Sequence, residues 1–360
     1  MSSRYQLAVL LAGLALLLAF PLTGDRFYVQ FVSKILIMVV FASSLNLLVG
    51  YTGLVSLGHA AFFGIAGYIV ALYSPETHAA GFWTSLALSV CGAALLALLI
   101  GLLVLRTGGI FFIMATLAFA EMLFYLFHDT AIAGGSDGIF INERPILSIG
   151  GWQPIDLSNF VHFYYLVLAF TAAVIVMLRT LLHSPFGKVI AGIRINEHRM
   201  RSLGFDTFRY KLVCFVIAGA LAGLAGYLSA VQFGVVNPEM LGWHHSGSVL
   251  MMVILGGMGT LSGPVIGAFA LMMLEEVFQS LTKHWQLLTG VVIVLVALYL
   301  PRGLAGLLPK EPADNSKTPP AAAGPDSGTT SSCVDSSDAD SSSADSSSTT
   351  SSSAALQNRV

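Results

Sequence analysis

Apolar segments about 20 residues long, separated by short polar turns, constrain the fold of this chain more than any other feature. A helix of that length is long enough to cross the hydrocarbon core of a bilayer. Apolar residues make up 56% of the sequence and charged residues 10%, whereas soluble domains carry roughly 25% charged residues. We therefore predict an all-α, polytopic membrane protein.

Eight apolar segments are predicted to cross the membrane, and a ninth is broken. The eight are residues 5–22, 28–49, 53–73, 82–105, 110–127, 160–182, 210–232 and 287–300. The ninth, residues 246–278, contains a glycine-rich run at 256–264. It is predicted to form two half-helices, a re-entrant hairpin from the outside, because unwound backbone inside a bilayer must be buried in protein or line a watery path. Residues 5–22 lack a clear signal-peptide cleavage site and are interpreted as a retained helix.

The loop at residues 184–206 sets the predicted orientation. Seven of the 17 lysine and arginine residues lie between Arg179 and Lys211. Such an excess in a short loop marks the cytoplasmic side of a membrane. The loop at residues 128–159 has the opposite bias, with four acidic residues and one arginine, and is predicted to lie outside. Both termini are then predicted to be cytoplasmic.

The same basic loop is predicted to contain a short helix followed by a second helical piece. Ser184 is suited to cap the first, and Pro185 sits where a missing N–H costs nothing. Gly204 is predicted to end the second piece, which follows Asn196 and Glu197. Such a helix along the membrane surface is a docking element. The alternative, which composition alone favours, is a solvated loop that only sets topology.

Three strings in the sequence resemble LivM-type permeases of branched-chain amino acid ABC importers. They are Ser184-Pro-Phe-Gly-Lys with the following residues to Leu212, the Gly- and Ser-rich string at 44–68, and Gly134-Gly-Ser-Asp-Gly138. The last separates the chain somewhat from related urea permeases. The resemblance covers residues 35–305. Where such proteins usually carry two alanines, this chain has Arg199 and Met200, which puts the ATPase contact in doubt.

The resemblance implies a permease subunit in the bacterial inner membrane, without a cofactor, that translocates branched-chain, hydrophobic amino acids. The implied partners are a paralogous permease subunit, two ABC ATPase subunits and a periplasmic substrate-binding protein, with membrane lipid around them and no nucleic acid. A cytoplasmic coupling helix would connect the ATPases to the membrane helices. Two alternatives stay open: an importer of another small solute such as urea or an amide, and a membrane-embedded enzyme that uses Glu121 or His59.

The candidates for ATPase coupling all lie in the basic loop. They are Gly187, Arg194, Asn196, Glu197 and Gly204. Arg194 and Glu197 are three residues apart, a spacing at which opposite charges can pair along one helix face. No phosphate-binding loop is present, because Gly187-Lys188 is followed by valine and no glycine precedes it at the required spacing. The chain is therefore predicted not to hydrolyse ATP itself.

Candidates for the translocation pathway lie in the string at 44–68, at Glu121 and in the glycine-rich run. They are Asn46, Gly53, Ser56, Gly58, His59, Glu121, Gly256 and Gly257. A charge at mid-membrane costs about 2.5–3.5 kcal/mol, so it usually faces a cavity or a partner. A structural hydrogen bond remains an equal alternative for Glu121. Close helix packing is the alternative for the small residues, and His59 is interpreted as a packing residue.

The remaining features carry no predicted chemistry. The cysteines are scattered, and His244 and His245 would diverge on a helix, so no metal site is predicted. Residues 309–360 are dominated by Ser, Asp, Ala and Thr towards the end and are predicted to form a disordered cytoplasmic tail after a permease domain at residues 1–308.

Overall fold

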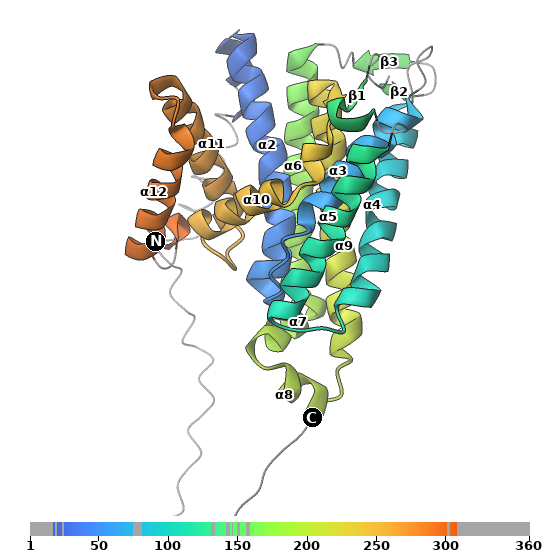
Figure 1. Cartoon of the computed structure of the whole chain (residues 1–360), viewed down its shortest axis with the longest axis vertical. Helices are drawn as coiled ribbons and strands as arrows, with labels where there is room; N and C mark the ends of the chain where they lie inside the picture. The colour runs from blue at the N-terminus through green and yellow to red at the C-terminus, as the bar shows by residue number, and fades with distance from the viewer. Residues whose placement is uncertain are drawn as a thin grey trace, which may run out of the picture. The chain divides into compact units, whose positions relative to one another are not determined.

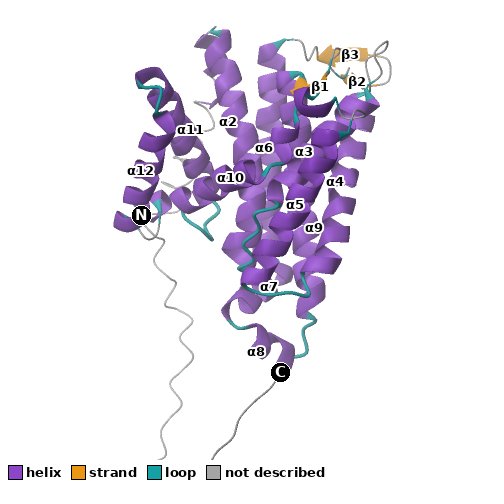
Figure 2. Cartoon of the chain, viewed as in Figure 1, coloured by secondary structure: helices purple, strands orange, loops and turns teal. Residues whose placement is uncertain are grey.

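A computed structural model describes residues 17–18, 20–23, 25–74, 81–130, 134–141, 145, 147–149, 152–155, 159–300 and 303–307. Most of these residues are helical, as Figures 1 and 2 show. The α-helices are α2 (Arg26–Asn46), α3 (His59–Tyr73), α4 (Phe82–Val104), α5 (Ile110–Asp129), α6 (Phe160–His183), α7 (Pro185–Ile195), α8 (Glu197–Ser202), α9 (Thr207–Phe233), α10 (Trp243–Gly256), α11 (Gly263–Leu281) and α12 (Trp285–Tyr299). The predicted all-α, polytopic fold is confirmed.

Six helices in the described part are long and apolar enough to cross a membrane. They are α2 together with a π-helix, η2 (Leu47–Thr52), and then α4, α5, α6, α9 and α11. Two shorter apolar helices, α3 and α12, accompany them. The predicted crossing at residues 5–22 and the predicted tail at 309–360 lie largely or wholly outside the described residues, so the count of eight crossings stays a prediction.

Helix α9 lies at the centre of the helical packing and contacts α2, α3 and α4. After its basic first turn, from Leu212 to Val231, its sequence is apolar or small on every side, which is typical of a buried helix. Small residues bring the backbones together: a Cβ on Gly226 would collide with the carbonyl oxygen of Phe63 in α3. Aromatic residues, among them Phe62, Phe215 and Tyr227, fill the core between these helices.

Helix α3 is shorter than the predicted segment at 53–73. It begins at His59, and the six residues from Gly53 to Gly58 are not helical. The reason lies just upstream, where η2 ends at Gly53 with a left-handed φ of 76°, a conformation that stops a helix and suits glycine. The prediction of a full-length helix at 53–73 is therefore wrong.

The chain breaks between α10 and α11, as predicted. We call residues 257–262, which join the two helices, the α10–α11 turn. Helix α10 has 14 residues, but α11 has 19 and meets the length and hydropathy of a membrane span. The prediction of two half-helices is therefore wrong for the second of them. The helices pack closely, because a Cβ on Gly267 would collide with the carbonyl oxygen of Met252.

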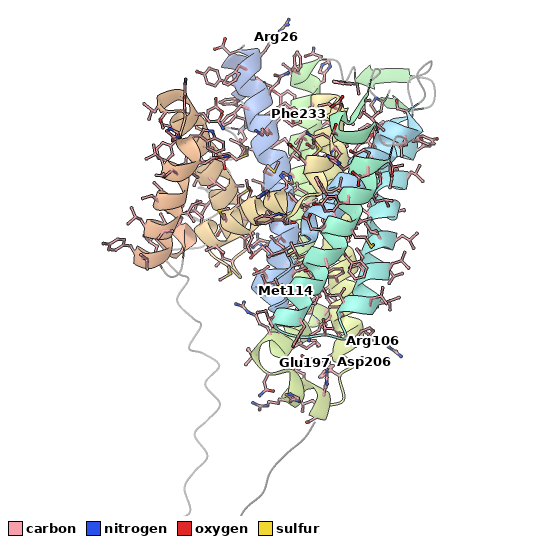
Figure 3. All side chains as sticks on the ribbon, viewed as in Figure 1. Arg26, Arg106, Met114, Glu197, Asp206 and Phe233 are labelled. Atoms are coloured by element: carbon pink, nitrogen blue, oxygen red, sulfur yellow. The ribbon has the colours of Figure 1, made fainter. Side chains whose placement is uncertain are left out.

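The loop predicted to lie outside contains short strands. Strand β1 (Ile139–Phe140) pairs antiparallel with β4 (Val235–Val236), which follows α9, and β2 (Leu147–Ile149) pairs with β3 (Trp152–Ile155). These strands lie at the upper end of the helices in Figure 1, and α7 and α8 lie at the lower end. In Figure 3, Arg26 and Phe233 mark the upper end and Arg106, Glu197 and Asp206 the lower one. The acidic and basic loops are thus at opposite ends of the helices. The described residues also form four 3-10 helices: η1 (Phe20–Thr23), η4 (Gly135–Asp137), η5 (Pro238–Leu241) and η6 (Leu304–Leu307).

Candidate functional site

The basic loop contains the two predicted helices, α7 and α8. The Ser184 hydroxyl accepts a hydrogen bond from the Gly187 N–H at 3.5 Å and caps α7, with Pro185 at its first position. The Asn196 carboxamide accepts from the Arg199 N–H at 3.0 Å and caps α8. Gly204 follows α8 with a φ of 88° and reverses the chain toward α9. Local capping thus explains both helices.

Glu197 binds within the loop, and its predicted pairing with Arg194 is wrong. One carboxylate oxygen accepts from Arg201 Nη2 at 2.7 Å and from the Thr207 hydroxyl at 3.0 Å. The other accepts from Lys211 Nζ at 2.6 Å. Burial alone would raise the pKa of Glu197, but these hydrogen bonds and the charge of Lys211 hold that pKa below its usual range. Glu197 therefore fastens α8 to the start of α9.

Arg194 turns toward the membrane helices. Its Nη1 donates to the carbonyl oxygen of Gly50 in η2, and its Cγ lies 3.4 Å from where a Cβ on Gly53 would stand. Gly50 is in the last turn of η2, where carbonyl groups lack a helical partner and a cation is favourable. Arg194 is separated from Glu197 because each has a partner in a different helix.

The loop also exposes apolar side chains. Ile195, at the end of α7, is 86% exposed, and Leu203, just after α8, is 65% exposed, whereas Ile190 and Ile193 are buried. Exposed apolar residues beside charged ones are typical of a binding surface for another protein. The sequence candidates do not include Leu203. Its position next to the helix-ending Gly204 in a polar loop could have indicated an exposed contact residue.

Asn46, Gly256 and Gly257 lie together around the α10–α11 turn. Asn46 is buried at the end of α2, where its Nδ2 donates to the Thr260 carbonyl at 2.9 Å and its Oδ1 accepts from the Gly259 N–H at 3.0 Å. A Cβ on Gly256 would collide with the carbonyl oxygen of Gly263, so the start and end of this turn touch. Gly50 lies against both the Asn46 carboxamide and Gly259, so Asn46 and the turn form a polar joint inside the protein.

Ser56, Gly58 and His59 are packed at the start of α3. The His59 Nε2 and the Ser44 hydroxyl are 2.8 Å apart, and the imidazole stacks on Phe41 with 5.5 Å between ring centres. Both His59 and Ser56 are fully buried. A Cβ on Gly58 would collide with a backbone carbonyl oxygen of α5. These contacts are those of packing residues.

A cavity of about 960 Å³ lies among α5, η5, α10, α11 and α12. Of the predicted pathway residues, Glu121 lines it, and a Glu121 carboxylate oxygen accepts from the Trp243 N–H at 3.4 Å. The described residues of its lining include two further carboxylates, Glu239 and Glu275, and no lysine or arginine. Trp285 adds apolar surface. The size is that of a small-molecule site. Lys34 offsets part of the charge of Glu275, so Glu121 and Glu239 are the carboxylates that favour a cationic group.

Two of these lining residues were missed from the sequence. Glu239 lies in η5 and Trp243 is the first residue of α10, in a stretch after α9 that has no hydropathy signal. In the described residues, no group of three or more histidine, cysteine, aspartate or glutamate side chains is arranged to hold a metal ion.

Comparison with known proteins adds independent information. The family model described as "Branched-chain amino acid transport system / permease component" matches residues 27–297. The chain is 33% identical over 322 residues to the high-affinity branched-chain amino acid transport system permease protein LivM of Escherichia coli K12, which covers 84% of this chain and 76% of that protein.

More distant relatives match shorter or weaker stretches. The permease protein LivH of the same Escherichia coli system is 31% identical over 106 residues, covering 29% of this chain and 34% of LivH. The L-arabinose ABC transporter permease protein AraH of Azospirillum brasilense is 23% identical over 258 residues, covering 69% of this chain and 72% of AraH. No solved structure matches the chain.

Proposed function

Because the chain belongs to the family of permease components of branched-chain amino acid transport systems, we propose that it is a membrane permease subunit of an ABC importer that translocates branched-chain, hydrophobic amino acids. The observation that carries the proposal is the family match across residues 27–297, which contains both the cavity and the α7–α8 loop. ATP hydrolysis drives the transport. We assign this hydrolysis to separate subunits, because the phosphate-binding loop pattern is not found in this sequence.

The working assembly contains a second, paralogous permease subunit, two ABC ATPase subunits and a periplasmic substrate-binding protein. The match to both LivM and LivH supports a paired permease, since these relatives carry the names of two permease proteins of one transport system. The excess of cations at the α7–α8 end supports a cytoplasmic position for that end, and hence cytoplasmic termini in a bacterial inner membrane.

The α7–α8 loop is the surface that receives an ATPase subunit. Ile195 and Leu203 are exposed on this loop, and Gly187, Asn196 and Gly204 set the shape that presents them. The role of Glu197 is to hold α8 on α9, so that force applied to α8 reaches a membrane helix. We expect Leu203→Asp to reduce co-purification of the ATPase, because it places a charge in an apolar contact. Arg106→Ala, a change on an exposed residue at the same end of the helices but outside the α7–α8 loop, is the control.

The cavity is part of the translocation route. A branched-chain amino acid carries an ammonium group and an apolar side chain, and the cavity offers carboxylates at Glu121, Glu239 and Glu275 beside the aromatic surface of Trp243 and Trp285. The ammonium would be attracted to the carboxylates and the side chain to the indoles. The other predicted pathway residues act elsewhere, in the joint at the α10–α11 turn or in helix packing.

Uptake of radiolabelled solutes tests the proposal in cells that lack the gene and carry wild-type or variant chain. We expect wild type to restore uptake of leucine, isoleucine and valine. Glu121→Gln should lower it, whereas Glu276→Gln, which changes a glutamate that does not line the cavity, should not. Restored uptake of urea, an amide or arabinose in place of leucine would assign another solute. Arabinose is included because the chain also matches AraH, an L-arabinose transporter permease protein.

A further inference from the structure

Two side chains join the cytoplasmic loop to the α10–α11 turn through one short piece of η2. Arg194 of α7 donates to the carbonyl oxygen of Gly50, and Asn46 binds the backbone of Gly259 and Thr260. Gly50 and Gly259 touch, because a Cβ on Gly50 would collide with the Gly259 nitrogen. The contact runs without a gap from α7 to the turn.

The Arg194 end of this chain of contacts is a charge-assisted hydrogen bond. Its acceptor belongs to the last turn of η2, where the backbone carbonyls have no partner within the helix. A Cβ on Gly259 would also stand 2.9 Å from Arg194 Nη1, so the guanidinium lies against the turn itself. Displacement of α7 therefore changes the position of a group that touches both η2 and the turn.

The Asn46 end uses both polar atoms of one carboxamide. Its donor and its acceptor bind consecutive residues of the turn at 2.9 and 3.0 Å, and the side chain is buried. Such a two-point contact fixes orientation as well as distance. Gly259 adopts a φ of 80°, which glycine tolerates and which other residues rarely adopt, so the turn can present its backbone to Asn46.

The α10–α11 turn also connects two helices, α10 and α11, that form walls of the cavity. Helix α10 runs from the turn to Trp243 and His244, and α11 runs from it to Glu275; each of these residues lines the cavity. We propose that Arg194 and Asn46 are positioning residues that transmit movement of α7 to the α10–α11 turn, and thereby to the α10 and α11 walls of the cavity. This inference rests on the proposed function, since it assigns the path by which the ATPase acts on the route.

The test uses the complete assembly in proteoliposomes and measures leucine transported per ATP hydrolysed. We expect Arg194→Ala and Asn46→Leu to keep bound, active ATPase but to lower this ratio about tenfold, the change for losing about 1.4 kcal/mol of a charge-assisted or paired hydrogen bond. Arg194→Lys, which keeps a charged donor, should recover part of it. Arg106→Ala removes an exposed cation at the same end of the helices but outside the α7–α8 loop, and should leave the ratio unchanged.

A distance measurement reports on the link without reference to the solute. Spin labels at Met258→Cys in the turn and Leu103→Cys at the lower end of α4, both exposed sites, are placed in a chain without its native cysteines. ATP binding should change the distance between them in wild type, and Arg194→Ala should abolish that change. If Arg194→Ala shows the wild-type change in this distance and the wild-type ratio of leucine transported per ATP, the proposed link is overturned. Absence of leucine transport by the wild-type assembly instead refutes the proposed function.

Discussion

Substitution of Glu197 by alanine removes the attachment of α8 to α9 at a single point. The carboxylate accepts hydrogen bonds from Lys211, Arg201 and Thr207 at 2.6, 2.7 and 3.0 Å. Glu197→Ala leaves all three donors without this acceptor, and of the two cationic donors the Lys211 ammonium has less access to water than the Arg201 guanidinium. We expect α8 to open locally while the membrane helices stay folded.

The magnitude follows from the exposure of each partner. The Lys211 side chain is 15% exposed and that of Glu197 31%, so this charge-assisted bond is worth about 1.5 kcal/mol, the low end of its usual range. Arg201 is 59% exposed, and such a pair contributes about 0.5 kcal/mol. The sum of about 2 kcal/mol corresponds to roughly a thirtyfold increase in local opening.

Hydrogen exchange of the Leu203, Gly204 and Phe205 amides measures this opening, because all three donate to carbonyls of α8. Since the folded-state pKa of Glu197 is lowered, its contribution is fully present above the usual glutamate pKa of about 4.3 and is lost as the pH falls through the lower folded-state value. Arg209→Ala, which removes a pair with Asp206 that is 83% and 51% exposed, is the control. Equal protection in Glu197→Ala and wild type would refute the reasoning.

Three further predictions concern the loop, the tail and the orientation. Gly204→Val forces a β-branched residue to a φ of 88°, a strain of about 1–3 kcal/mol, and should lower ATPase co-purification at least several-fold; unchanged recovery would contradict the proposed docking surface. Deletion of residues 313–360 should leave leucine uptake unchanged at equal expression, because this Ser- and Asp-rich sequence has few of the apolar residues that packing needs, and a large loss would reveal a partner for it. A cysteine introduced as Ser148→Cys should react with an impermeant reagent added outside intact cells; reaction from the cytoplasmic side alone would overturn the topology.

Local signals explain what could be predicted from the sequence. Ser184, Pro185 and Gly204 act on the backbone within a few residues, so the start of α7 and the end of α8 followed from capping rules. Helices α4 and α5 begin at the predicted residues, because an apolar run between polar turns determines where a membrane helix can start. The loss of six residues from the start of α3 did not follow, since nothing in the composition of this string distinguishes a π-helix and a coil from a helix.

Long-range contacts explain what could not be predicted. Arg194 and Gly50 are 144 residues apart, and Asn46 binds the turn more than 200 residues away. The spacing of three residues predicts that Arg194 pairs with Glu197. Instead, Arg194 binds Gly50 of η2, and Glu197 binds Lys211 of α9. The cavity shows the same limit: Glu121 was recognised because a charge in an apolar segment is conspicuous, whereas Glu239 and Trp243 join it only through the folding of η5 and α10.

The most direct test of the account is ATP-dependent accumulation of radiolabelled leucine in proteoliposomes that contain this chain, its paralogous permease, the ATPase subunits and the substrate-binding protein. The account predicts accumulation only when ATP is on the side of the α7–α8 loop and all subunits are present. Omission of this chain should abolish it. Accumulation of leucine at the same rate without this chain, or none with the complete assembly while another solute is transported, would contradict the assignment.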